Sequence, residues 1–426
     1  MSGIDGFILN RMKVLIVGSG GREHALAWRL DREGVDVVVA PGNGGTPHTA
    51  AIASTDVEAL ARLARQERVD LTIVGPEAPL AAGLVDTFAE QGLKAFGPTR
   101  MAARLEWSKA WTKAFLTRHG IPTAGAEVVD SEPAARRAIA RLGLPIVLKA
   151  DGLASGKGVF VATSEMEVDA AFDQLFRRKT LGAAADQVLL EEYLEGPELS
   201  LLAFTDGERL GMMPAARDYK RLLDGDRGPN TGGMGGYTRP SYASAALLAE
   251  VEQRILLPAL VGMQAEGEPY RGVLYAGLML TRAGPKVLEF NCRFGDPECQ
   301  LILPLLSSRL LDVCQAVVEG RLTPTELAWT DDRAYGVVLA ARGYPEAAET
   351  GQVVTGTDAL PPGILAFHGA TRRDGDRLVT SGGRVLTLVG SQRQAVYDAA
   401  DTIRFAGKQA RRDIGLELAS GVVAAP

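Results

Sequence analysis

Short apolar runs alternate with stretches of helical periodicity over the first hundred residues. The helical stretches carry apolar residues at intervals of three and four, as Val57, Leu60, Leu63 and Ala64 do. The apolar runs, each long enough for a strand, are residues 13–17, 35–40, 71–74 and 94–97. Strands that alternate with helices at this spacing predict a parallel sheet flanked by helices. Such sheets bind ligands in the loops after their strands, so the turns that follow the first and third runs are candidate contacts.

The pattern changes after residue 100. A helix, two strands around a glycine loop, a second helix and another strand predict a small lid. These are residues 101–120, 145–150, 159–162, 165–180 and 187–196. More strands with a helix near 243–265 follow, and short strands with one helix around Val396 end the chain. We therefore predict an α/β protein with four parts. They are a parallel-sheet substrate domain (12–107), a helical linker and lid (108–196), a central domain (197–330) and a mostly-β domain (331–426).

Composition narrows the classes of function. The chain has 426 residues, 23% of them charged, and a net charge of −6 without a basic block, which argues against nucleic-acid binding. Three cysteines without a Cys-x-x-Cys pair are typical of a reducing compartment, so we expect a cytoplasmic protein. No apolar run approaches the ~18 residues of a membrane span. The first eleven residues lack the features of a signal peptide.

The first glycine turn resembles a dinucleotide-binding fingerprint but departs from it. Residues 18–24 read GSGGREH, and Glu23 occupies the place of the third glycine in G-x-G-x-x-G. A glycine turn before a helix still offers backbone N–H groups to an anion, and Arg22 adds positive charge. We therefore predict a phosphate-bearing substrate here rather than NAD, with a purely structural turn as the alternative.

A second glycine loop, GLASGKG at residues 152–158, differs from a P-loop. Three residues rather than four separate its first two glycines, and Gly158 stands where a P-loop has Ser or Thr. A flap that closes over phosphates, with Lys157 at its tip, fits better, and a plain hairpin turn is the alternative. Lys149 ends the apolar strand before this loop. Because an unpaired buried ammonium is costly, we expect Lys149 to have an anionic partner.

Two further segments give weaker signals. Residues 187–194 read QVLLEEYL, and the end of such a strand could offer backbone groups to a flat ring, although a surface strand is the simpler interpretation. Residues 228–236 contain five glycines and follow the charged run RDYKR at 217–221. Flexible glycines beside these charges indicate a loop that covers substrate, with a disordered surface loop as the alternative.

Polar residues end the apolar strand at 286–291. Glu289 and Asn291 are two residues apart, so in a strand both side chains point to one face. Two hard oxygens suit Mg²⁺, which takes few protein oxygens and leaves room for substrate phosphates. Arg293 follows, where its guanidinium could hold a transferring phosphoryl group or a substrate carboxylate. A solvated strand end with surface salt bridges is the alternative.

Together these segments resemble the ATP-grasp superfamily and, within it, the phosphoribosylamine–glycine ligases. The resemblance covers nearly the whole chain and is carried by VLIVGSGGREHALAW, VAPGNGGT, LTIVGPEAPL, SKAWTKAF, PIVLKADGLASGKGV, GPNTGGMGGY, LYAGLM and VLEFNCRFGDPECQ. It implies an ATP-grasp fold with an N-terminal pre-ATP-grasp domain, a lid and a C-terminal mostly-β domain. It also implies that the carboxylate of glycine attacks ATP to form glycyl phosphate. The amine of 5-phosphoribosylamine then attacks this intermediate to give glycinamide ribonucleotide, a step of purine biosynthesis.

The resemblance implies a role for each residue that matches a family motif. ATP would meet Lys109, Lys149, Ser155, Gly156, Lys157, Gly158, Glu191, Glu192, Tyr193, Leu194 and Glu198. Glycine or 5-phosphoribosylamine would meet Gly20, Gly21, Arg22, Glu23, Glu77, Pro79, Gly233, Asp296, Pro297 and Glu298. Glu289 and Asn291 would hold Mg²⁺, with Mn²⁺ as an alternative ion, and Arg293, Asp218 and Lys220 would act in catalysis. Neither a membrane nor a nucleic acid is an expected partner, and the oligomeric state is open, with a monomer as one option.

The chain departs from the superfamily in two places. The strand before Glu289 reads YAGLML and lacks the further metal carboxylate of many relatives, which leaves the number of metal ions open. RDYKR has Tyr219 where relatives often carry His, so we assign Tyr219 no catalytic role. Three alternative functions stay open: another ATP-grasp ligase that uses bicarbonate or formate, an NAD-dependent oxidoreductase, and a nucleotide sensor without turnover.

Overall fold

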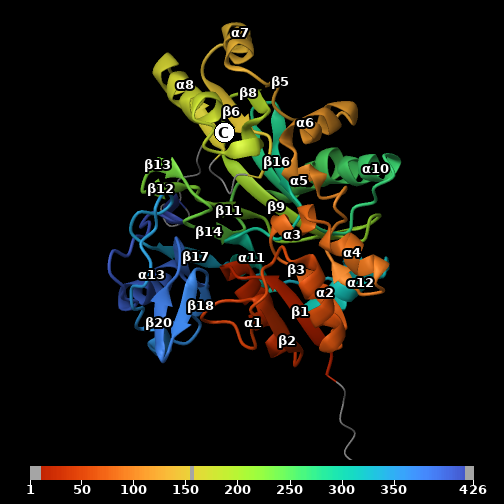
Figure 1. Cartoon of the computed structure of the whole chain (residues 1–426), viewed down its shortest axis with the longest axis vertical. Coiled ribbons are helices and arrows are strands. Elements are labelled where there is room, and N and C mark those ends of the chain that lie inside the picture. The colour runs from red at the N-terminus through yellow and green to blue at the C-terminus, as the bar shows by residue number, and fades with distance from the viewer. Residues whose placement is uncertain (1–10, 154–157, 418–426) are drawn as a thin grey trace, which may run out of the picture.

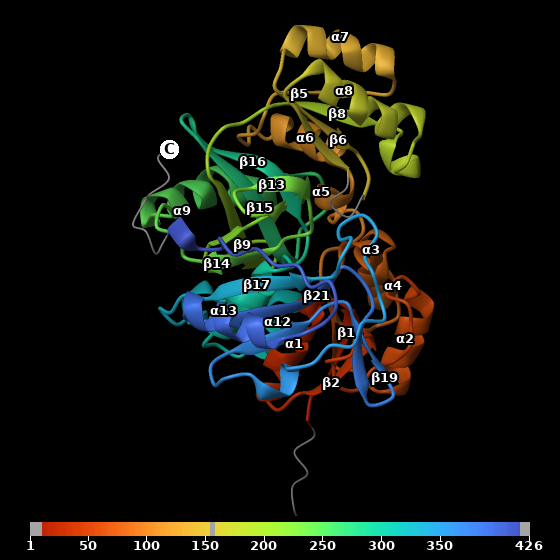
Figure 2. The ribbon, with the colours of Figure 1, turned by 90° about the vertical axis from the view of Figure 1, so that its left-hand side faces the viewer.

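The computed structural model describes residues 11–153 and 158–417 and confirms the predicted α/β class (Figure 1). The lid forms one end of the molecule and the parallel sheet of the N-terminal domain lies near the other, with a large antiparallel sheet between them (Figure 2). No helix among the described residues is long and apolar enough to cross a membrane.

The N-terminal domain contains the predicted parallel sheet, in the order β2-β1-β3-β4. Its strands are β1 (Lys13–Gly18), β2 (Asp36–Pro41), β3 (Leu71–Val74) and β4 (Ala95–Phe96), and its helices are α1 (Gly21–Arg32), α2 (Val57–Gln66), α3 (Glu77–Ala81) and α4 (Leu84–Glu90). Strand β1 is buried on both faces, as parallel strands usually are. Because β1 and β3 are adjacent, the glycine turn after β1 and the start of α3 come at the same edge of the sheet.

The predicted lid has its own antiparallel sheet, in the order β5-β8-β6-β7. Its elements are β5 (Ala126–Val129), α7 (Glu132–Leu142), β6 (Ile146–Ala150), β7 (Val159–Ala162), α8 (Glu165–Phe172) and β8 (Val188–Glu192). Leu148, Phe172 and Leu190 belong to a separate hydrophobic core inside the lid. The helix predicted at 165–180 is shorter than expected, because α8 ends at Phe172 and a π-helical stretch, Asp173–Arg177, follows it.

The central and C-terminal domains share one nine-stranded sheet of antiparallel pairs. Its order is β16-β15-β9-β11-β14-β17-β21-β18, with β10 paired to β9. The strands are β9 (Glu198–Thr205), β10 (Leu210–Met212), β11 (Ala216–Asp218), β14 (Gly235–Thr238), β15 (Gly272–Thr281), β16 (Gly284–Asn291), β17 (Tyr335–Ala340), β18 (Leu365–His368) and β21 (Arg384–Gly390). The pairing of β14 with β17 carries the sheet across the predicted boundary at residue 330, so the two parts are structurally continuous.

The remaining elements connect these sheets. Helices α5 (Arg104–Trp107) and α6 (Lys109–Arg118) lead to the lid, α9 (Ala245–Val251) and α10 (Leu257–Ala265) precede β15, and α11 (Glu298–Ile302) and α12 (Leu310–Val318) follow β16. The hairpin of β19 (Thr371–Asp374) and β20 (Arg377–Thr380) and the helix α13 (Arg393–Thr402) belong to the C-terminal domain. Val396 and Ala399 of α13 are buried, as their spacing predicts.

The glycine-rich segment at 228–236 is more ordered than a free loop. Strands β12 (Arg221–Leu223) and β13 (Arg227–Asn230) form a hairpin, and four residues separate the end of β13 from the start of β14. Gly233 has a φ of 116°, and a Cβ at this position would lie 2.6 Å from Cδ of Pro297. Gly233 is therefore required for a close approach to residues 296–297, and flexibility is not its role here.

Candidate functional site

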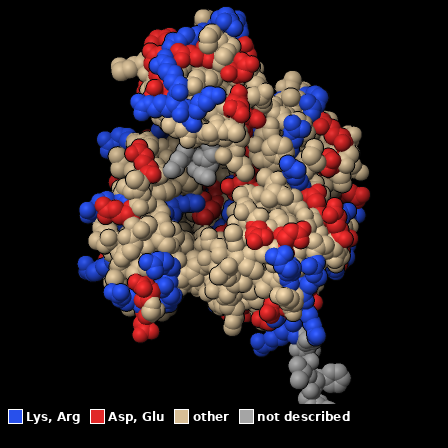
Figure 3. Space-filling model, in the orientation of Figure 1, with Lys and Arg blue, Asp and Glu red and all other residues tan. Residues whose placement is uncertain are grey.

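The end of β16 carries the two oxygen donors expected from the sequence. Glu289 lies opposite Gly277 of β15, and Asn291 lies opposite Tyr275, so the two side chains share one face of the strand. A bulge precedes them, because Val287 pairs with Leu278 and Leu288 has no counterpart in this register. The surface is hollowed beneath the lid, with acidic and basic side chains inside the hollow (Figure 3).

Lysines surround the carboxylate of Glu289. The Nζ of Lys220 lies 3.7 Å from Oε1 of Glu289 and 3.2 Å from Oε2 of Glu198. Burial raises the pKa of Glu289, but Lys220, Lys149 and Lys109 act more strongly together and lower it below its ordinary value. The Glu289 carboxylate is therefore ionised at neutral pH, as a metal ligand must be.

The donor set at β16 fits magnesium. Among the described residues, no group of three or more His, Cys, Asp and Glu side chains is arranged to hold a metal ion. Glu289 and Asn291 supply one carboxylate and one amide oxygen, and Mg²⁺ is commonly bound by one or two protein oxygens together with substrate phosphates. These two side chains could hold the ion only if a phosphate-bearing ligand completes its coordination.

The lid contributes a lysine directly to this strand. Lys149, the penultimate residue of β6, donates from Nζ to the carbonyl oxygen of the bulged Leu288 at 2.9 Å and forms an ion pair with Glu191 at 2.6 Å. Lys113 reaches the other oxygen of Glu191 at 2.8 Å. Lys113 was not predicted to have a role, although it lies one helical turn after Lys109 on the same face of α6.

The other predicted nucleotide residues lie along the edge between lid and central sheet. Lys109 donates to the carbonyl oxygen of Gly152 at 3.3 Å, and burial lowers its pKa. Gly158 accepts a hydrogen bond from the backbone of Ala150, and Ser155, Gly156 and Lys157 lie outside the described residues. Glu192, the last residue of β8, and Tyr193 after it are exposed, and Leu194 is buried. The backbone N–H of Glu192 already donates to Gly125.

Arg293 connects the end of β16 to the N-terminal domain. Its Nη2 lies 2.7 Å from Oε1 of Glu106 in α5, and its Nε lies 3.2 Å from Oε2 of Glu77 in α3. Arg293 was predicted to act in catalysis and Glu77 to bind substrate, and the structure brings them together as an ion pair. Glu106 was not identified from the sequence, because it looks like an ordinary charged residue within a short helix and its partner lies 187 positions later.

Glu77→Gln is expected to reduce the free energy of unfolding at pH 7 by about 1–3 kcal/mol. Burial raises the pKa of Glu77, but Arg293 and Arg22 outweigh it and lower this pKa from 4.5 to about 2. Ionised Glu77 therefore stabilises the folded state above pH 4.5, and this contribution is lost as the pH falls towards 2. Urea unfolding of the ligand-free protein at pH 7 and pH 4 tests this, with exposed Glu90→Gln as the control. A loss equally large at both pH values would contradict it.

Asp218, which is partly buried, adjoins a buried polar cluster around Glu298. Oε1 of Glu298 accepts hydrogen bonds from the hydroxyl of Tyr275 at 2.6 Å and from Ser200 at 3.3 Å. The Ser200 hydroxyl also lies 3.5 Å from Oδ1 of Asp218. Burial and the neighbouring carboxylates raise the pKa of Asp218 to about 7, against the opposing effect of Lys220. The structure gives Glu298 internal partners at the base of the site, and its contact with substrate stays a prediction.

The glycine turn after β1 faces Asp296 and the C-terminal domain. A pocket of about 210 Å³ lies there, lined by Ser19, Gly20, Gly21, Asp296, Gly369, Ala370, Arg384 and Thr387. Nη2 of Arg384 lies 3.3 Å from Oδ2 of Asp296. A larger pocket of about 750 Å³ shares Ser19, Gly369 and Ala370 and is also lined by Asn43, Arg372 and Arg373. The sequence around Arg384 does not predict that this residue lines a pocket, because only the sheet topology brings it beside the turn.

Other residues predicted at this turn have internal contacts. The Glu23 carboxylate accepts from the backbone N–H of Gly20 at 2.5 Å and pairs with Nε of Arg22 at 2.6 Å. Nη1 of Arg22 donates to the carbonyl oxygen of Phe294 at 3.1 Å. Pro79 is buried within α3. Glu23 and Arg22 therefore hold the turn against the segment after β16, and their contact with substrate stays a prediction.

Three family models match consecutive parts of the chain. They are described as the N domain (residues 12–106), the ATP-grasp (A) domain (107–299) and the C domain (334–417) of phosphoribosylglycinamide synthetase. A phosphoribosylamine–glycine ligase of Ralstonia nicotianae is 49% identical over 417 residues, which cover 95% of this chain and 99% of the relative. The trifunctional purine biosynthetic protein adenosine-3 of Homo sapiens is 45% identical over 419 residues, covering 95% of this chain and 42% of that protein.

Solved structures with similar folds include one close in sequence and one distant. The phosphoribosylamine–glycine ligase of Thermotoga maritima superimposes with a TM-score of 0.82 at 35% identity, covering 95% of this chain and 100% of that chain. The biotin carboxylase domain of Hydrogenobacter thermophilus 2-oxoglutarate carboxylase, in complex with ADP and magnesium, gives a TM-score of 0.70 at 16% identity, covering 93% and 91%. The second likeness shows a shared fold alone.

Proposed function

Because the chain belongs to the phosphoribosylglycinamide synthetase family and catalyses the ATP-dependent joining of glycine to 5-phosphoribosylamine in purine biosynthesis, we propose that the reaction proceeds through glycyl phosphate beside Glu289 and Asn291. One observation carries this proposal. An ionised carboxylate, Glu289, and an amide, Asn291, lie where lysines from the linker helix, the lid and the central domain converge. Such a site suits the polyphosphate of a nucleotide and the charge that develops during phosphoryl transfer.

The chemistry follows from the poor reactivity of a carboxylate towards an amine. An oxygen of the glycine carboxylate attacks the γ-phosphorus of ATP, and the bond to the ADP oxygen breaks. The amine of 5-phosphoribosylamine then attacks the glycyl carbonyl carbon, phosphate leaves with the glycine oxygen, and the amine loses a proton. Positioning and neutralisation of charge are the main tasks of the protein, since no side-chain nucleophile takes part.

The nucleotide lies between lid and central sheet in this proposal. Glu191 and the backbone of residues 192–194 hold adenine, and Glu198 holds the ribose. Lys109 and Lys149 meet the phosphates, together with Ser155, Gly156, Lys157 and Gly158. Glu289 and Asn291 hold Mg²⁺, which would neutralise phosphate charge when bound. The hydrogen bond of Lys149 to Leu288 supports this arrangement, because it brings a lid lysine next to Glu289.

The second substrate lies at the glycine turn. Gly20, Gly21, Gly233, Asp296 and Pro297 surround or adjoin the pocket of about 210 Å³, which has room for part of 5-phosphoribosylamine. Lys220 reaches Glu289, and Asp218, two residues before it, lies beside Ser200, so we assign Asp218 and Lys220 to the reacting groups. Mn²⁺ as an alternative ion, a cytoplasmic location and a monomeric state are further parts of the proposal.

Arg384→Gln is expected to raise the KM for 5-phosphoribosylamine about tenfold or more, the usual effect of removing one charge-assisted hydrogen bond. Arg384 lines the pocket beside Gly20, and its guanidinium is only partly covered by Asp296. The KM values for ATP and glycine should stay within about twofold, because neither is assigned to this pocket. Steady-state kinetics with exposed Arg377→Gln as the control measures this. Equal rises in all three KM values would contradict the location of the substrate.

The function is tested by ADP release from ATP, Mg²⁺, glycine and freshly made 5-phosphoribosylamine. The expected result is ADP formation that requires both glycine and the amine. Bicarbonate and formate in place of glycine test the alternative ligases, and nucleotide binding without ADP release would identify a sensor. Turnover that does not depend on glycine would contradict the proposed function.

A further inference from the structure

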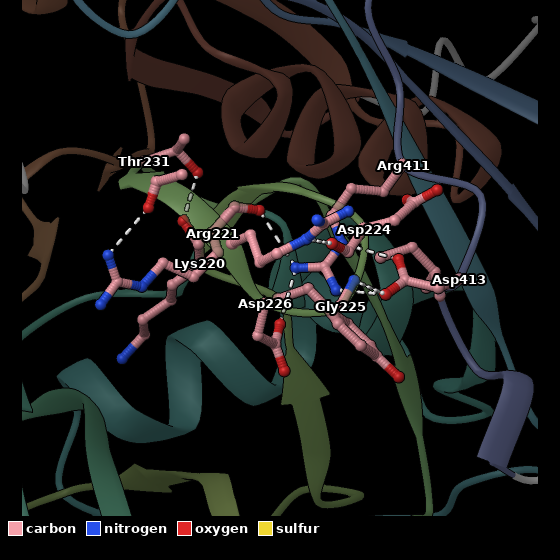
Figure 4. A network of polar contacts seen from close by, with 12 residues as sticks. Lys220, Arg221, Asp224, Gly225, Asp226, Thr231, Arg411 and Asp413 are labelled. Carbon is pink, nitrogen blue, oxygen red and sulfur yellow. Dashed lines mark hydrogen bonds and ion pairs between the residues drawn. The ribbon is translucent and has the colours of Figure 1, made fainter.

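The hairpin that follows Lys220 is attached to the last described segment of the chain. The turn of the hairpin, residues 224–226, lies against residues 411–413 (Figure 4). The backbone N–H of Gly225 donates to Oδ2 of Asp413 at 2.8 Å, and the backbone N–H of Arg412 donates to Oδ1 of Asp224 at 2.8 Å. Segments 188 residues apart in sequence are therefore joined beside the proposed site.

Arg411 is the centre of this contact. Its side chain has 0% exposure. Nε and Nη2 donate to the two oxygens of Asp413 at 2.7 and 2.6 Å, and Nη1 donates to Oδ1 of Asp226 at 2.7 Å. A bidentate pair of this kind fixes the plane of the guanidinium, so Arg411 presents its remaining donor in one direction.

Arg411 contacts both neighbours of Lys220. Its Nη1 donates to the carbonyl oxygen of Arg221 at 3.1 Å, and its Cζ lies 4.7 Å from the centre of the Tyr219 ring. The Tyr219 hydroxyl donates to Glu417 at 2.5 Å and accepts from the backbone N–H of Gly415 at 3.0 Å. The backbone on either side of Lys220 is thus held by the C-terminal segment.

Lys220 itself is directed to the proposed metal ligand Glu289. Its carbonyl oxygen accepts from the backbone N–H and the hydroxyl of Thr231 at 2.7 and 2.8 Å. Its side chain leads away from Arg411 (Figure 4), and its Nζ reaches Glu198 and Glu289. With both neighbours and its own carbonyl held, the direction of the Lys220 side chain depends on the attachment of the hairpin.

We propose that Arg411 is a positioning residue that directs the side chain of Lys220 toward Glu289. The C-terminal segment, residues 411–417, would then contribute to the geometry of the nucleotide site. This inference rests on the roles proposed above for Lys220 and Glu289. If Arg411 only stabilised the fold, its substitution would lower stability, and the molecules that still fold would need the same Mg²⁺ concentration for half-maximal rate. A positioning Arg411 affects that concentration and the mobility of the hairpin together.

Arg411→Gln tests the proposal against Arg412→Gln, the same change at the next residue, whose guanidinium pairs with exposed Asp401 and does not contact the hairpin. Arg411→Gln should lower kcat and raise the Mg²⁺ concentration for half-maximal rate, each about 10-fold, as loss of groups that orient metal-site residues usually does. Amide hydrogen exchange of residues 221–230, measured without substrates, should accelerate by a similar factor. Arg411→Lys should recover part of both effects, and Arg412→Gln should show neither.

A double variant decides whether Arg411 acts through Lys220. In a Lys220→Ala background, Arg411→Gln should cause no further loss of turnover, because the residue that it positions is already gone. Additive losses, or unchanged exchange of the hairpin in Arg411→Gln, would overturn the proposal. Absence of glycine-dependent turnover in the unaltered protein would instead refute the proposed function, and the exchange measurement would still decide whether Arg411 holds the hairpin.

Discussion

Glu289→Gln is expected to lower glycine-dependent turnover about 10²–10³-fold while weakening nucleotide binding less than about tenfold. The substitution keeps the shape of the side chain but removes the charge that makes it a ligand for a hard cation. It also removes the negative charge that partly neutralises Lys220, Lys149 and Lys109. These three lysines therefore still attract the nucleotide phosphates in the variant. The loss therefore falls mainly on the phosphoryl-transfer step.

Turnover by coupled ADP assay and MgATP binding by calorimetry, both at saturating Mg²⁺, measure the two effects separately. Exposed Glu346→Gln is the control for removal of one negative charge from the molecule. Equal losses in turnover and in binding would argue that Glu289 contributes to affinity alone and would contradict its assignment as a metal ligand.

Arg293→Met is expected to reduce turnover at least about 100-fold and the free energy of unfolding by about 3 kcal/mol. The stability effect arises because Glu106 is buried and would lose a partner that lies 2.7 Å away. The turnover effect arises because Arg293 stands two residues after Asn291, at the junction where glycine would be activated. These two consequences have different causes and can be separated.

Adding Glu106→Gln to Arg293→Met removes the uncompensated buried charge. The double variant should therefore regain part of the stability in urea unfolding, while its turnover stays low. Recovery of turnover in parallel with stability would show that Arg293 serves only to pair with Glu106, and it would contradict a role for Arg293 in the reaction.

Periodicity predicted the elements whose apolar side chains decide their position. β1, β3, β6, β15 and β16 correspond closely to the apolar runs, because burial on one or both faces leaves a repeating pattern. The hairpin of β12 and β13 has few apolar residues and depends on contacts with Arg411 and Asp413. The continuity of the sheet through β14 and β17 could not be predicted either, because strand pairing between distant segments leaves no local pattern in the sequence.

The candidate site was predicted where spacing within one strand determines geometry. Glu289 and Asn291 share a face for this reason. Glu106, Lys113 and Arg384 were missed because each acquires its partner only through tertiary structure. Glu23 and Glu298 have internal hydrogen-bond partners that residue type and motif position did not predict. Contact of either residue with substrate stays a prediction.

The fate of the glycine oxygens tests the proposed mechanism most directly. With glycine labelled by ¹⁸O in both carboxylate oxygens, the reaction is run with ATP, Mg²⁺ and 5-phosphoribosylamine, and the products are analysed by mass spectrometry. A glycyl phosphate intermediate predicts one ¹⁸O in the released phosphate and one ¹⁸O retained in the glycinamide carbonyl. Phosphate without ¹⁸O would contradict activation of glycine by phosphoryl transfer and, with it, the proposed function of the Glu289 site.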